Sequence, residues 1–366
     1  MSIKVCHISD CHAVNDNRIF LKECTSLARE GYNVSYIAVG NSDYKNGVKR
    51  IGIKKRGVIG RIFITRLDII HIIKGMDFDI VHLHDPTLLF LVKYFKKYGK
   101  KIIFDSHEDY YLQIQHKGYI PEFLRLKVAR IFRRYLKQIS SHLDGFIFPA
   151  ENHDIDVITP ITVVGNSPEI KQNNQNFPLL PISQRNRTIC YIGGLSKSRG
   201  IVNLIKAAYM AKCKLILAGK FVNEEYQQSC EKMEEYSVVD YRGVVDHDEI
   251  SSIINESRIG MAVLLNIGQY GIIPNLATKT TEYCAQGLPV FLNRTKFNES
   301  IVAEYNFGVC IDPEDIEGYA NTLCEYLDNP VLLEKLGANG RQMVEEKYNW
   351  KNDLNNLKAL YSSLEK

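Results

Sequence analysis

Several features that define large protein classes are missing from this sequence. None of its apolar runs reaches about eighteen residues, so no membrane-spanning helix is expected. The nine cysteines are odd in number and include no Cys-x-x-Cys pair, which favours reduced thiols over a disulfide framework or a zinc site. The first residues lead directly into an apolar strand and do not resemble a signal peptide. These absences together predict a cytoplasmic protein.

Glycine is also missing from the first strand–turn–helix unit. The apolar strand 3–8 ends in Ser9-Asp10, and a helical pattern follows Asp16-Asn17-Arg18. Dinucleotide-binding turns need glycines because the backbone must approach a pyrophosphate closely. NAD binding is therefore not expected at this turn.

The sequence does contain two series of alternating strand and helix patterns. Between them, residues 171–187 are rich in Asn, Gln and Pro without periodicity, as in a linker or an exposed loop. We predict an α/β protein with two doubly wound parallel sheets, one in residues 1–168 and one in 169–349, followed by a C-terminal helix in 350–366.

Charge is distributed unevenly between the two halves of the chain. Residues 1–165 hold 25 Lys and Arg against 17 Asp and Glu, whereas the remainder has a net balance of −4. The predicted helix 121–139 carries six basic residues interleaved with apolar ones. It is interpreted either as a surface helix that packs by one face or as a helix that lies on an anionic bilayer.

Polar clusters follow two strands predicted in the first half. His82-Leu83-His84-Asp85 ends the strand at 79–83, and Ser106-His107-Glu108-Asp109 follows the strand at 101–105. The carboxyl edge of a parallel sheet is where α/β folds bind ligands. A metal site at His82, His84 and His107 is one interpretation, but the side-chain alternation of a strand favours a His82 that points into the sheet.

The second half contains a pattern suited to phosphate. A strand at 188–192 leads into Gly193-Gly194, then Arg199, then a helix at 201–210. Such a loop would bring backbone N–H groups and a guanidinium close to an anion, although a plain turn with an incidental arginine is the alternative. Further along, Lys279 and Glu282 share a short helix that ends at Gly287. The pair is either a solvated ion pair or part of the same nucleotide site, with the carboxylate on a ribose diol.

These motifs, in this order, resemble the retaining glycosyltransferases of family 4, which have a GT-B fold of two Rossmann-like domains facing a central cleft. The resemblance covers essentially the whole chain. The motifs that carry it are Asp16–Ile19, Asp79–Pro86, Phe104–Glu108, Tyr191–Leu195 with Arg199-Gly200, Tyr241–Val245 with Glu249, and Lys279–Val290.

The resemblance implies transfer of a sugar from a nucleotide-sugar donor, with UDP favoured and GDP second, with retention and without a catalytic metal or other cofactor. The acceptor would be a saccharide or a lipid-linked glycan on the basic first domain, in cell-surface polysaccharide synthesis at the inner face of the membrane. An anionic membrane surface is thus an expected partner, and nucleic acid is not. The last helix would pack back on the first domain.

The resemblance also implies residue roles. His107, Arg199 and Lys279 would be catalytic. Donor binding would involve Gly193, Gly194, Arg199, Gly243, Lys279 and Glu282. The acceptor side would involve Asp16, Arg18, Asp85 and Glu108.

Two positions depart from the family pattern. Pro274 stands where many members have a first glutamate, eight residues before Glu282, and Gly194 stands where many have a basic residue. Two alternatives to a transferase therefore remain. One is a non-hydrolysing sugar-nucleotide epimerase that uses Asp85, Asp105 and Glu108, and the other is a catalytically silent sugar-nucleotide-binding partner.

Overall fold

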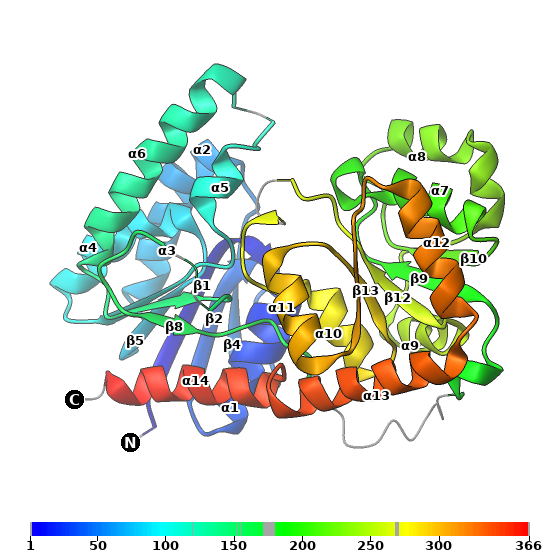
Figure 1. Cartoon of the computed structure of the whole chain (residues 1–366). Coiled ribbons are helices and arrows are strands. Elements are labelled where there is room, and N and C mark those ends of the chain that lie inside the picture. The colour runs from blue at the N-terminus through cyan, green and yellow to red at the C-terminus, as the bar shows by residue number, and fades with distance from the viewer. Residues whose placement is uncertain are drawn as a thin grey trace. The chain divides into compact units, whose positions relative to one another are not determined.

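A computed structural model of the chain describes residues 2–118, 120–151, 153, 155–170, 180–267 and 271–364. The chain divides into two compact units (Figure 1). Unit 1 comprises residues 1–166 together with 350–366, and unit 2 comprises residues 167–349. Part of the predicted linker, residues 171–179, lies outside the described residues.

Unit 1 is built on an eight-stranded sheet with the order β3-β4-β2-β1-β5-β6-β7-β8. Every neighbouring pair is parallel except β3 and β4, which are antiparallel. The strand order reverses direction between β1 and β5, so the carboxyl ends of these two strands form the switch point at which such sheets bind ligands. The elements are β1 Lys4–Ala13, the π-helix η1 Asn17–Cys24, α1 Thr25–Arg29, β2 Asn33–Val39, β3 Asp43–Lys45, β4 Val48–Ile53, α2 Val58–Gly60, η2 Arg61–Thr65, α3 Arg66–Ile73, β5 Ile80–Leu83, η3 Pro86–Leu91, α4 Val92–Lys97, β6 Lys101–Asp105, α5 Tyr110–Ile114, α6 Glu122–Ser140, β7 Gly145–Phe148, β8 Ile161–Val163 and α14 Trp350–Ser363.

Unit 2 has a six-stranded, wholly parallel sheet with the order β11-β10-β9-β12-β13-β14. Its switch point lies between β9 and β12. Buried apolar side chains form a core cluster on each face of this sheet. The elements are η4 Ile182–Gln184, β9 Thr188–Ile192, η5 Lys197–Arg199, α7 Ile201–Met210, β10 Lys214–Ala218, α8 Glu224–Glu231, η6 Glu234–Val238, β11 Val239–Gly243, α9 His247–Glu256, β12 Ile259–Ala262, α10 Thr278–Ala285, β13 Val290–Asn293, α11 Lys296–Tyr305, β14 Gly308–Ile311, α12 Ile316–Leu327 and α13 Pro330–Glu346.

The C-terminal helix α14 packs into the core of unit 1. Trp350, Leu357 and Tyr361 are almost fully buried in the same apolar cluster as β1 and β2. The Trp350 indole donates a hydrogen bond to the Ser26 hydroxyl (2.8 Å), and the Gly165 N–H donates to the Asp353 carboxylate (2.9 Å). The last helix of the chain is therefore a structural part of its first sheet.

Two local expectations need correction. Residues 180–187 are mostly exposed, as expected of a loop, but Ile182 and Arg185 are buried, and the Arg185 guanidinium anchors the segment by donating to carbonyls of unit 2. The antiparallel β3–β4 hairpin was not predicted. Its turn is Asn46-Gly47, with φ of 53° and 79°, and this dipeptide is a strong hairpin signal that was present in the sequence.

Candidate functional site

Three strands of unit 2 end in glycines that lie against one another. The Gly193 N–H donates to the Ala218 carbonyl after β9, and the Gly219 N–H donates to the Gly243 carbonyl after β11. A Cβ at Gly219 would lie 1.9 Å from the Gly193 carbonyl oxygen, so no other residue fits there. The loop from Gly193 then runs through η5 to the N-terminus of α7, whose first-turn N–H groups lack intrahelical partners. This edge of the sheet is therefore suited to an anion.

Lys279 is buried beneath this loop. The residue is 8% exposed, and its Nζ lies 3.3 Å from the centroid of the Tyr191 ring. A Cβ added to Gly193 would lie 3.1 Å from the same Nζ, so the ammonium approaches the loop directly. Within the described residues this Nζ has no hydrogen-bond partner. A buried, unsatisfied ammonium is costly unless a ligand pairs with it.

The electrostatics of this site favour an anionic ligand. Burial, and then the nearby Arg199 guanidinium, hold the pKa of Lys279 well below its usual value. Arg199 ends η5 directly before the left-handed Gly200 that begins α7. Glu282 is exposed on α10, and its charge acts in the opposite direction by raising the pKa of Lys279. Because Lys279 itself is buried, the two residues are not the fully solvated pair of the alternative interpretation. A diphosphate at the loop would add negative charge beside both Lys279 and Arg199.

Tyr191 is a part of this site to which the sequence pattern gave no role. Its ring carries the Lys279 ammonium on one face, and its hydroxyl donates to the Gly194 carbonyl (3.1 Å). Tyr191 thus positions both the cation and the glycine loop. Tyr191 is the penultimate residue of β9 and stands two positions before Gly193. This position was the signal in the sequence that could have identified it as a site residue.

The switch point of unit 1 is organised by Asp85. Its carboxylate accepts hydrogen bonds from the Ser9 hydroxyl (2.6 Å), the Asp10 N–H (2.8 Å) and the Cys11 thiol (2.7 Å). Burial, with Asp85 beside it, raises the pKa of Asp10 to about 6, although Arg61 donates to it. Asp85 therefore holds the irregular carboxyl-terminal part of β1 in place.

Two other acceptor-side candidates are engaged in local structure. Asp16 caps η1 by accepting from the Arg18 and Ile19 N–H groups. The Arg18 guanidinium is buried and donates to Glu23 (3.1 Å) and to Asp105 (3.0 Å). Burial alone would raise the pKa of Asp105, but Arg18 and neighbouring histidines hold it well below its usual value. Asp16 and Arg18 position the polar interior of unit 1.

His107 and Glu108 lie at the end of β6 and are half-buried. The His107 Nε2 lies 3.2 Å from the Nδ1 of His84 and 3.4 Å from Asp105. One Glu108 carboxylate oxygen is buried and has no hydrogen-bond partner in the part of unit 1 that the structure describes. These two side chains are therefore the predicted residues of unit 1 best placed to meet a ligand.

Comparisons with known proteins identify the family. Residues 17–167 match the model of Glycosyltransferase Family 4, and residues 172–343 match that of Glycosyl transferases group 1. Together the two matches cover most of the chain. The chain belongs to the family 4, group 1 glycosyltransferases and has their GT-B fold of two Rossmann-like domains, as predicted.

Individual relatives are distant. An uncharacterised glycosyltransferase of Methanocaldococcus jannaschii is 23% identical, over 79% of this chain and 76% of its own. An uncharacterised 41.2 kDa protein in the cps region of Klebsiella pneumoniae is 24% identical, over 81% of this chain and 82% of its own. The structure of Anabaena HepE in complex with UDP-glucose matches with a TM-score of 0.72 at 12% identity, over 99% of this chain and 100% of that one.

Proposed function

We propose that this glycosyltransferase moves a sugar from a UDP-linked donor, with GDP-linked donors as the second choice, to a saccharide or lipid-linked acceptor. The observation that carries the proposal is the buried Lys279 Nζ, which has no hydrogen-bond partner among the described residues and lies directly beneath the Gly193 loop. The complex of HepE with UDP-glucose supports the choice of uridine. The Klebsiella relative encoded in a cps region supports a role in surface polysaccharide synthesis.

The reaction would proceed with retained configuration. The bond between the anomeric carbon and the donor phosphate oxygen breaks, and the acceptor hydroxyl forms the new glycosidic bond and loses its proton. Arg199 and Lys279 would stabilise the charge that develops on the leaving diphosphate, together with the N-terminus of α7. Glu282 would bind the ribose hydroxyls, His107 would face the sugar, and Glu108 would contact the acceptor.

A nucleotide screen tests the donor site. Thermal and urea unfolding with UDP, GDP, ADP and CMP should show the largest stabilisation with UDP, about 2.7 kcal/mol at a hundredfold the dissociation constant. Lys279→Met should remove most of this stabilisation. A matched variant, Lys232→Met, removes an exposed cation of the same unit and should retain it. If no nucleotide stabilises the wild-type protein, the proposed function fails.

Sugar transfer should not require a divalent metal in the donor site. Fixed cations already face the proposed diphosphate position, so magnesium or manganese is not needed to neutralise it. Transfer should proceed at an unchanged rate in excess EDTA. Loss of activity that Mn²⁺ or Mg²⁺ restores would contradict this expectation.

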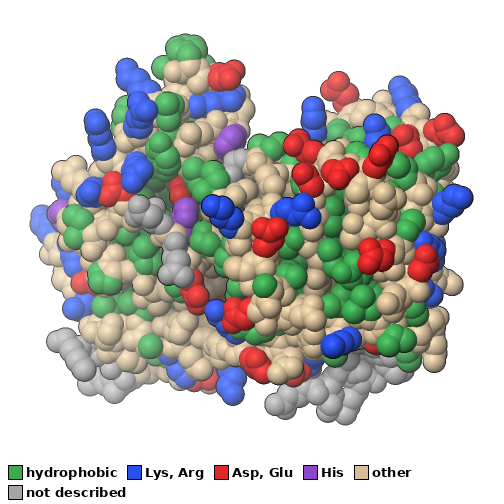
Figure 2. Space-filling model, viewed as in Figure 1, with side chains coloured by type: hydrophobic (Ala, Val, Ile, Leu, Met, Phe, Trp, Pro, Cys, Tyr) green, Lys and Arg blue, Asp and Glu red, His purple; other side chains and the backbone are tan. Residues whose placement is uncertain are grey.

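We also propose that unit 1 binds peripherally to anionic membranes through α6. Among the described residues, no helix is both long and apolar enough to cross a bilayer. One face of α6 packs inward through Ala129 and Leu136, whereas Phe123 is 82% exposed and Ile131 is 57% exposed. Figure 2 shows Lys and Arg side chains beside hydrophobic ones over the surface that α6 forms. An exposed helix face that combines basic and hydrophobic side chains is suited to an anionic bilayer.

Vesicle co-sedimentation tests this surface. Arg130→Glu/Arg134→Glu should weaken binding to anionic vesicles by roughly thirtyfold or more, because each basic residue near such a surface contributes about 1 kcal/mol. Binding should also fall as salt rises. The double variant Lys232→Glu/Lys335→Glu makes the same charge change on unit 2 and should bind normally. Equal binding to neutral vesicles would show that α6 is only structural.

A further inference from the structure

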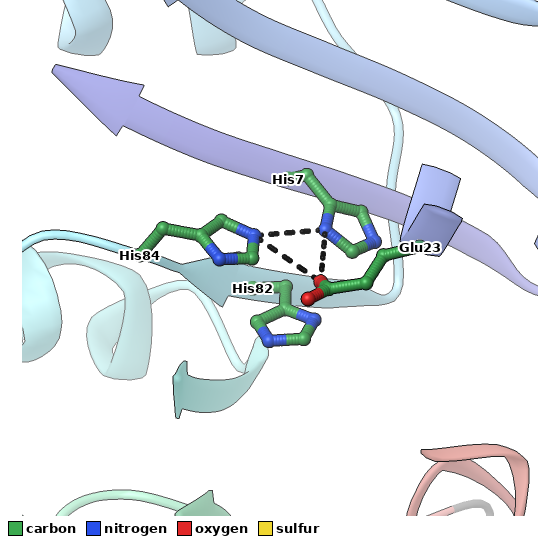
Figure 3. Close-up of side chains that lie close together, drawn as sticks. All are labelled: His7, Glu23, His82 and His84. Carbon is green, nitrogen blue, oxygen red and sulfur yellow. Dashed lines mark hydrogen bonds and ion pairs between the residues drawn. The ribbon is translucent and has the colours of Figure 1, made fainter. Parts of the chain in front are cut away.

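A group of buried polar side chains in unit 1 has no role in the proposed reaction. His7 lies on β1, His82 on β5 and His84 directly after β5, and Glu23 comes from η1 (Figure 3). None of the four is more than 1% exposed. His7 and His82 are direct neighbours across the sheet, and His84 follows two residues later on the same face. Three imidazoles therefore meet one carboxylate inside a protein core.

The spacing of their polar atoms matches a coordination shell. The His7 Nδ1 lies 2.9 Å from the His84 Nε2, and the Glu23 Oε2 lies 3.7 Å and 3.8 Å from these two nitrogens. The four nearest polar atoms, including one from His82, lie within 4.8 Å of one another. Tetrahedral zinc with bonds of about 2.0–2.1 Å separates its ligand atoms by roughly 3.3 Å. The observed distances lie on both sides of this value.

The outer nitrogen of each ring already has a partner. The Tyr361 hydroxyl lies 2.8 Å from the His82 Nδ1 and 3.3 Å from the His7 Nε2, so it can accept from both. The His84 Nδ1 lies 3.2 Å from the His107 Nε2. Metal-binding histidines typically donate their second N–H in this way. With these tautomers, three nitrogen lone pairs point towards one place.

Two atoms at that place are unsatisfied. The His82 Nε2 and the Glu23 Oε2 are buried and have no hydrogen-bond partner among the described residues. Without a metal, the three rings cannot all have these tautomers, because the His7 Nδ1 and the His84 Nε2 share a hydrogen bond at 2.9 Å. A bound metal would take the place of that hydrogen, which would move to an outer ring nitrogen, and would also meet the two unsatisfied atoms.

We propose that His7, His82, His84 and Glu23 hold a divalent first-row transition metal, with zinc as the first candidate. Imidazole nitrogens with one carboxylate suit zinc and its neighbours, and four protein ligands close the shell, as in structural sites. The site is buried and takes no part in sugar transfer. The metal site interpreted from the sequence comprised His82, His84 and His107. The site proposed here keeps His82 and His84, leaves out His107 and adds His7 and Glu23.

A neighbouring set of groups is less suited to the ion. Asp105 and His107 approach His84 and Glu23 on the other side. Arg18 donates to both oxygens of Asp105, whereas it donates only to the Oε1 of Glu23 and leaves the Oε2 without a hydrogen-bond partner among the described residues. The unsatisfied His82 Nε2 belongs to the first set alone and therefore favours that set.

Metal content is the direct test. Untagged wild-type protein from zinc-supplemented medium should contain about one zinc per chain after dialysis. His82→Gln should lose it, whereas His142→Gln, which changes an exposed histidine, should retain it. Wild-type zinc far below one per chain, or equal loss in both variants, would overturn the proposal.

A second measurement does not depend on whether a ligand variant folds. Wild-type protein stripped of metal in denaturant and refolded with Co²⁺ should show visible d–d absorption and a raised melting temperature. Tyr361→Phe keeps the ring but removes the hydroxyl, and should weaken zinc binding by about 10–100-fold. The neighbouring Tyr32→Phe serves as its control. Absence of both the absorption and the rise in melting temperature in the wild-type protein would overturn the site.

Discussion

Lys279→Met is expected to reduce turnover by about a hundredfold or more while it stabilises the unliganded protein. Loss of one preorganised cation at a leaving group typically costs about 2.7–4 kcal/mol in the transition state. The same Nζ is buried without a hydrogen-bond partner among the described residues, so an apolar side chain of similar shape should stabilise the fold by about 1–3 kcal/mol. Steady-state kinetics and urea unfolding measure the two effects.

Companion variants separate the roles at the donor site. Arg199→Ala should also lower kcat strongly, because its charge matters most as the diphosphate leaves. Glu282→Gln should raise the donor KM and leave kcat nearly unchanged, since ribose hydroxyls carry no new charge in the transition state. Lys232→Met is the neutral control. If Lys279→Met destabilises the protein and leaves kcat unchanged, Lys279 is a structural residue.

This site also predicts proton uptake on nucleotide binding. Burial lowers the pKa of Lys279 in the folded protein, so its neutral form contributes stability at high pH, and that contribution is lost as the pH falls through the lowered pKa. A bound diphosphate would raise the pKa again. Calorimetry in buffers of different ionisation enthalpy should show uptake in the wild-type protein and not in Lys279→Met.

The second large effect is expected in unit 1. Arg18→Met should cost about 3–5 kcal/mol of unfolding free energy, because Glu23 and Asp105 then remain buried without their cation. Arg133→Met removes a more exposed ion pair with Asp156 and should cost less than about 1 kcal/mol. Urea unfolding of both variants measures the difference, and equal small losses would contradict it.

The loss in Arg18→Met should depend on pH. In the wild-type protein the lowered pKa of Asp105 contributes stability above its unfolded value of about 3.9, and this is lost in acid. In the variant, the pKa values of the buried Glu23 and Asp105 carboxyls would lie above those in the unfolded chain. A raised pKa favours folding only at a pH below the pKa of the unfolded chain. The destabilisation relative to wild type should therefore be largest near pH 7 and shrink as the pH falls below about 4, towards the lowered pKa of Asp105.

The sequence predicted the fold because its strongest signals are local. Strand 188–192 and helix 201–210 were placed at their observed bounds, since apolar runs and flanking glycines mark them clearly. The β3–β4 hairpin was missed although Asn46-Gly47 marks its turn. The Gly193-Gly194 motif marks in the same way the loop that we propose binds the donor diphosphate.

The side-chain environments could not be predicted from spacing. Lys279-x-x-Glu282 fits an exposed ion pair equally well, and only the approach of Tyr191 on a distant strand buries the lysine. Likewise, Glu23 meets His7 and His84 because the π-helix η1 turns it inward. Such contacts depend on packing between elements, which periodicity does not contain. The individual roles at both sites remain predictions.

The position of α14 in unit 1 has a consequence for the order of folding during synthesis. Residues 350–364 leave the ribosome only after all of unit 2, although Trp350, Leu357 and Tyr361 complete the core beside β1 and β2. Domains generally fold as units, beginning with the N-terminal one. Here the apolar surface that α14 covers on the sheet of unit 1 stays exposed while about 180 further residues are translated. The nascent chain is thus exposed to aggregation for most of its synthesis, and chaperones have that interval in which to bind it.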